Sequence, residues 1–169
     1  MIGIKRKLKN FGPLELLVLS SITYVVVMLF WTASTRSQVL QNANDIKSNH
    51  KSVVDFINGE VNSCSSNDEG LTSWGEKCNS VWTSDKIVSY VLSNIDLKNP
   101  YSINKPLIQT SQDPRIQAEG KAGQSTDKGI IFVSSNNFES EAGSEWVVGT
   151  CIKSPCVAAG NNELVSVYR

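Results

Sequence analysis

The sequence predicts an α+β protein in which one long N-terminal helix packs on a small antiparallel sheet of three to four strands. Residues 14–58 contain no proline and no glycine, and their apolar residues recur at helical spacing. Near the C-terminus, three short segments rich in β-branched and aromatic residues have the composition of strands. These two patterns together predict one helix followed by a compact sheet domain.

Residues 16–33 carry no charged side chain and are numerous enough to cross a bilayer as a helix. Four cations precede them, Lys5, Arg6, Lys7 and Lys9, and the positive-inside rule places such a segment in the cytoplasm. We therefore expect a basic cytoplasmic leader (1–12), a membrane-spanning helix half (13–33) and an extracytoplasmic C-terminal domain anchored in the inner membrane. A cleaved secretory signal ending near residues 32–34 is the alternative, although its apolar core would exceed the usual ~7–15 residues.

The helical pattern continues past the apolar run as an amphipathic helix half (34–62). One stripe of apolar residues carries this prediction: Val39, Leu40, Ala43, Ile46, Val53, Val54, Ile57 and Val61. Gly59 is a natural helix stop, so we expect the helix to end near it. Residues 63–169 then form the globular head.

In the head, residues 64–79 have the composition of a loop. A short helix is expected from Ser84 until Pro100 prevents its continuation, and residues 102–128 are expected to hold little regular structure. Strands are predicted at 129–135, 145–152 and 163–169, and their short connections predict an antiparallel meander. The amphipathic stripe is the predicted cover for one face of this sheet.

Charge and chemistry argue against several classes of function. The cations of the leader leave twelve Lys and Arg against sixteen Asp and Glu in the rest of the chain, which disfavours binding to nucleic acid. His50 is the only histidine, and its place on the apolar stripe predicts a packing role rather than catalysis. With no phosphate-binding glycine loop either, we expect no enzyme activity, no metal and no cofactor.

The four cysteines lie in the predicted extracytoplasmic part, where disulfides are favoured over metal binding. Three pairings are open. Pairs Cys64 with Cys78 and Cys151 with Cys156 are favoured because each closes a short local loop. A zinc site is the rival, but these spacings differ from the paired two-residue spacings of zinc motifs.

The whole arrangement resembles the type IV pilins and their pseudopilin relatives: a basic leader ending in Gly12, an apolar helix with Glu15 near its start, and a helix-covered sheet. The resemblance implies cleavage by a leader peptidase after Gly12, which would make Pro13 the first mature residue. It also implies that Glu15 neutralises a cationic terminus in a filament core, and that Cys151–Cys156 staples the last strands. The chain departs from the family pattern because Pro13 replaces the usual terminal residue and Glu15 is only third after the cut.

Simpler interpretations of these residues remain open. Pro13 is favoured in the first turn of any helix, and Glu15 in that turn is stabilised by the helix dipole. Small residues that would allow close helix packing, Ser20, Ser21, Ala33 and Ser34, are equally compatible with lipid.

Two functions follow as hypotheses. The first is a structural subunit of a pilus-like or pseudopilus filament on the cell surface, which self-associates through the N-terminal helix with the help of assembly machinery. The second is a single-pass anchored binding or accessory domain that never polymerises. Loops 67–77, with Trp74, and 109–128 are the expected contact surfaces.

Overall fold

The computed structural model describes residues 12–67, 69–102, 104–119, 128–136 and 145–169. The chain divides into two compact units, Met1–Gln41 and Asn42–Arg169. Helix α1 (Pro13–Ser66) belongs to both units and runs without interruption through residues 34–37. We call residues 13–41 of α1 its exposed half and residues 42–66 its docked half.

The prediction that the helix stops at Gly59 is wrong. Residues Asn58 to Ser66 continue α1, and a methyl group added at Gly59 would meet no atom within 4 Å. The helix continues because Val61 and Cys64, which lie beyond the glycine, are buried in the core of the head. This burial outweighs the modest cost of about 1 kcal/mol for one exposed glycine inside a helix.

The head contains a four-stranded sheet in the order β1-β2-β3-β4. Its strands are β1 (Ile108–Thr110), β2 (Ile131–Asn136), β3 (Glu145–Cys151) and β4 (Asn162–Tyr168). Strands β2, β3 and β4 form the predicted antiparallel meander. The predicted architecture, a long N-terminal helix on a small sheet, is confirmed, but the sheet is mixed because β1 pairs with β2 in parallel.

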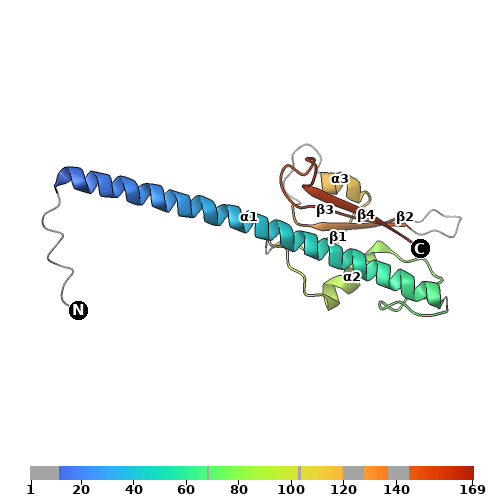
Figure 1. Ribbon diagram of the computed structural model, residues 1–169. Coiled ribbons are helices and arrows are strands. Elements are labelled where there is room, and N and C mark those ends of the chain that lie inside the picture. The colour runs from blue at the N-terminus through green and yellow to red at the C-terminus, as the bar shows by residue number, and fades with distance from the viewer. Residues whose placement is uncertain (1–11, 68, 103, 120–127, 137–144) are drawn as a thin grey trace, which may run out of the picture. The chain divides into compact units, whose positions relative to one another are not determined.

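Two further helices complete the head. Helix α2 (Ser84–Asn94) follows Thr83 and ends well before Pro100, so the proline does not terminate it. Helix α3 (Pro114–Glu119) lies against the opposite face of the sheet from α1, and the carbonyl of Pro114 and the side chain of Ala118 approach Gly149 of β3 (Figure 1). Together with β1, α3 corrects the prediction that residues 102–128 are irregular.

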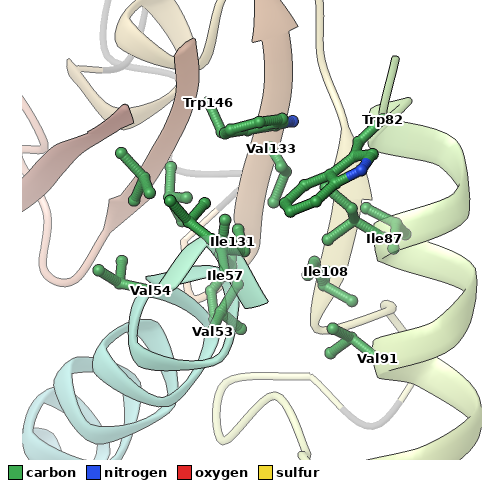
Figure 2. Packing of buried hydrophobic residues seen from close by; sticks show 14 of the residues in the cluster. Val53, Val54, Ile57, Trp82, Ile87, Val91, Ile108, Ile131, Val133 and Trp146 are labelled. Atoms are coloured by element: carbon green, nitrogen blue, oxygen red, sulfur yellow. The ribbon is translucent and has the colours of Figure 1, made fainter. Parts of the chain in front are cut away.

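The core of the head lies between α1, α2 and one face of the sheet (Figure 2). Val53 and Ile57 of α1 lie in the same cluster as Ile131 and Val133 of β2, whereas Val54 points aside. On the other side of the core, the indole of Trp82 stacks on that of Trp146 with 5.1 Å between ring centroids. From Ala43 to Val61 the predicted stripe is therefore the surface by which α1 packs in the head, whereas its first two residues, Val39 and Leu40, are exposed.

Two disulfides staple the head. Cys64 at the end of α1 is bonded to Cys78, and Cys151 at the end of β3 is bonded to Cys156. These are the two local pairs that the sequence favoured. The first ties the last turn of α1 to the following loop, and the second closes the turn after β3.

Candidate membrane and assembly surface

Within the exposed half of α1, residues 16–33 carry no charged side chain and present an apolar surface on all sides. Every residue from 13 to 41 is exposed in the isolated chain. An 18-residue window within α1 nevertheless has the length and hydropathy of a membrane span. Within the described residues, α1 is the one helix that meets this criterion. Water is a poor solvent for such a surface, so it requires a lipid or protein environment.

Five hydroxyl groups of this half are satisfied within the helix itself. Ser20 and Ser21 donate to the carbonyls of Leu17 and Val18, each at 2.8 Å. The hydroxyls of three threonines also donate to carbonyls three or four residues earlier: Thr23, Thr32 and Thr35. Because an unpaired hydroxyl is costly in hydrocarbon, these bonds make the segment compatible with a bilayer.

The start of α1 is capped by the residues that sequence analysis singled out for processing and assembly. Gly12 accepts a hydrogen bond from the Leu16 amide at 3.1 Å. Its own amide donates to Glu15 Oε2, also at 3.1 Å, which is half of a capping box. Pro13 is the first residue of α1, a position where its missing N–H costs no hydrogen bond. In the intact chain, the segment from Gly12 to Glu15 is thus a well-formed helix start.

This capping geometry makes Glu15 sensitive to processing. Cleavage after Gly12 would remove the amide that Glu15 contacts and would create a charged amine on Pro13. The carboxylate would then lose its described partner while a cation appeared near it. The intact and processed forms therefore differ in the electrostatics of a single helical turn.

The most unusual polar group in the head is His50, which is 2% exposed on the docked half of α1. Its Nε2 lies 3.2 Å from the carbonyl oxygen of Val148 on β3, and its Nδ1 lies 3.2 Å from Glu163 Oε2 on β4. Lys47 approaches the other carboxylate oxygen of Glu163 at 3.8 Å. His50 therefore connects α1 to two strands.

Burial lowers the pKa of His50, and the Val148 carbonyl and the Glu163 carboxylate only partly oppose this effect. The imidazole is accordingly neutral near pH 7 and can donate from one nitrogen only. Both of its neighbours are acceptors, so the neutral ring donates either from Nε2 to the Val148 carbonyl or from Nδ1 to the Glu163 carboxylate, and in both cases it has a structural role. The packing role predicted from the apolar stripe agrees with this burial, while the bridge between β3 and β4 could not be predicted from it.

The described residues hold no group of three or more His, Cys, Asp or Glu side chains that could bind a metal ion. Trp74, expected as a contact residue in loop 67–77, is half-buried instead. Its ring packs on Phe56 and Trp82 at 5.8 and 5.1 Å between centroids, and its indole N–H donates to Glu76 Oε2. In this loop Leu71, at 68% exposure, is the large apolar side chain that remains outside.

These features define a class: a disulfide-stapled α+β head joined to one helix that is long and apolar enough to span a membrane. Comparison with protein-family models, with curated proteins and with solved structures found no match for the chain.

Proposed function

We propose that this protein is a structural subunit of a pilus-like or pseudopilus filament, anchored in the inner membrane before assembly. The observation that carries the proposal is the helix α1, in which residues 16–33 are exposed and apolar all round while the docked half is integrated into the head. A subunit of this kind can exchange lipid for neighbouring copies of the same helix without unfolding the head. The basic leader supports a cytoplasmic N-terminus.

Glu15 has a defined role in this proposal. In the anchored, unprocessed chain its carboxylate caps the Gly12 amide. After cleavage it would neutralise the new amine of Pro13, in the same copy or in an adjacent one. An uncompensated charge in an apolar helix bundle is expensive, so the pair would fix the register between neighbours.

The test combines N-terminal mass spectrometry with imaging of surface filaments. We expect Pro13 as the first residue of the native protein, and this chain as a component of filaments sheared from cells. Glu15→Gln should lower the filament yield by about tenfold or more, because it leaves the terminal amine unpaired. The matched control is Asp45→Asn, an exposed carboxylate on the docked half, which should leave the yield unchanged.

A single-pass anchored domain that never polymerises is the second candidate. The hydrogen bond from Gly12 to Glu15 favours it, because this contact explains both residues without any processing. Retained Met1 together with a chain that stays in the inner membrane would establish this second function. Surface fibres that lack the chain would overturn the first.

A further inference from the structure

Strand β4 has a free edge. It lies at the end of the sheet order, and no described strand pairs with its outer side. Seven consecutive residues of β4 pair in register with β3, so no bulge interrupts it. Exposed edges of this kind are templates for the addition of another strand.

The direction of the backbone groups follows from the bonds at the end of this ladder. The amide of Ile152 donates to the carbonyl of Asn161, one pair beyond the last residue of β3. Because hydrogen-bonded pairs alternate in an antiparallel ladder, Val165 of β4 bonds to β3. The backbone groups of Leu164, Ser166 and Tyr168 consequently point toward the free edge.

Charged side chains usually protect such an edge, but the two charges at the ends of β4 are held against the head. Glu163 contacts His50 and Lys47. Arg169, which follows the strand, donates to the carbonyl of Ser80 and lies over the ring of Trp82 at 4.9 Å. Between them, β4 carries no Lys, Arg, Asp, Glu or Pro, and the edge is left unguarded.

A surface hollow of about 490 Å³ lies beside this strand, between β4 and α1. Its lining includes two lysines and two valines, Lys47, Lys51, Val54 and Val165, together with Ser48, His50 and the carboxylate of Glu163. The side-chain ammonium group of Lys51 makes no hydrogen bond or ion pair with the described residues, and Val165 is 36% exposed. The hollow therefore has room for side chains of an added strand and an unpaired cation to meet them.

We propose that the head binds an extended peptide segment of a partner protein as an additional strand on β4, and that every second residue of this segment is alternately apolar and acidic. Residues two apart in such a segment point to the same side, so an apolar side chain can lie against Val54 and Val165 while the acidic side chain two positions along lies near Lys51. The outward backbone groups of Leu164 and Ser166 would supply the main-chain hydrogen bonds. This surface does not use the exposed half of α1, so it is independent of filament assembly.

The test uses the full-length chain in phosphatidylcholine nanodiscs and a fluorescein-labelled nine-residue peptide, with valine at positions 1, 5 and 9, glutamate at positions 3 and 7, and threonine between them. Binding is measured by fluorescence anisotropy. A peptide with lysine in place of glutamate should bind roughly fivefold or more weakly, because it meets Lys47 and Lys51. A glutamate peptide that is N-methylated on every residue should bind at least about tenfold more weakly, since neither of its edges can then donate hydrogen bonds to β4.

Protein variants locate the site. Ser166→Pro removes an outward N–H and keeps the ladder with β3, and it should lower affinity by about tenfold or more. Lys51→Glu should weaken the glutamate peptide roughly fivefold. Lys98→Glu, the same change of charge at a lysine 83% exposed by its side chain, is the matched control and should leave binding unchanged.

Several outcomes would overturn the proposal. They are absence of binding at millimolar peptide, equal binding of the lysine and glutamate peptides, and undiminished binding of the N-methylated peptide. If Ser166→Pro does not fold, the N-methylated peptide alone decides. Dimerisation of the full-length chain through β4, detected by sedimentation and competing with the peptide, would identify a second copy as the occupant and also overturn it.

Discussion

The two halves of α1 share one secondary structure and differ completely in burial. None of the residues from 13 to 41 is buried, whereas the docked half buries a stripe that includes Ile46, Val53 and Ile57 at 0% exposure. Helix propensity does not distinguish them, because both halves are helical. The distribution of apolar residues does: a one-sided stripe needs only its own sheet, while an all-round apolar surface needs a partner outside the chain.

The largest expected effects come from introducing an aspartate into either half of α1, because the two positions should respond in different ways. Ile57→Asp puts an unpaired carboxylate into the core and should cost on the order of 4 kcal/mol or more, enough to unfold the head. Val26→Asp should leave the head folded and instead oppose membrane insertion by about 3 kcal/mol. Near-ultraviolet circular dichroism of the tryptophans reports the head, and alkaline extraction of membranes reports insertion.

Val54→Ala, which shortens a buried side chain and adds no charge, controls for the effect of size at the stripe. It should destabilise the head far less than Ile57→Asp. The docked half is expected to stabilise the head and the exposed half to insert into the membrane. This division of roles is incorrect if Val26→Asp unfolds the head, or if Ile57→Asp melts like the parent protein.

The disulfides should affect the docked half and the sheet but leave membrane insertion unchanged. Replacing Cys64 and Cys78 by alanine should cost about 3 kcal/mol, and replacing Cys151 and Cys156 about 2 kcal/mol. The order follows from sequence separations of 14 and 5, because the longer loop restricts the unfolded chain more. Denaturant titration of both double variants measures the difference, and a reversed order would show that native packing outweighs loop entropy.

Glycine substitutions test whether α1 truly continues past Gly59. Gly59→Ala should stabilise the head by about 1 kcal/mol, because the position is helical and an added methyl meets no atom within 4 Å. Gly75→Ala is the matched control. Its surroundings are equally open, but its φ of +83° is unfavourable for alanine, so this change should destabilise the head. Thermal melting distinguishes a rise from a fall.

The smallest effect concerns His50, the one buried polar residue among the described residues of α1. Burial lowers its pKa below the ordinary value of 6.5, so the unfolded chain binds the proton more readily than the folded head. Stability should therefore fall as the pH drops from 6.5 toward the lowered pKa, and should not change above 6.5 through this group. His50→Gln should flatten this part of the stability profile.

A second variant checks the cause. Glu163→Gln removes a carboxylate that raises the pKa of His50, so the loss of stability should extend to lower pH. Unchanged profiles in both variants would mean that His50 does not titrate within the folded head over this range.

Much of the architecture could be predicted from local pattern. Period-3.6 spacing identified α1 and its docking stripe, and β-branched segments identified β2, β3 and β4 to within about two residues at each end. The favoured disulfide pairs are both local, so short loops were sufficient to choose them. Capping at Gly12, Pro13 and Glu15 also follows from residues adjacent in sequence.

Other features depend on contacts between distant residues. Strand β1 has only three residues, and it exists because Ile108 pairs with Ile131 across a long stretch of chain. The helix passes Gly59 because Val61 and Cys64 find a core built by later segments. The hollow beside β4 combines α1 with the last strand, so no local pattern indicates it.

The sequence by itself determined α1, α2, the three strands of the meander and the apolar run within α1, because these properties depend on residues a few positions apart. Only the tertiary structure decided the mixed sheet, the partners of His50 and the inward-held charges that leave the edge of β4 open. Each of these depends on side chains brought together by packing, where burial and pairing outweigh the preferences of any single segment.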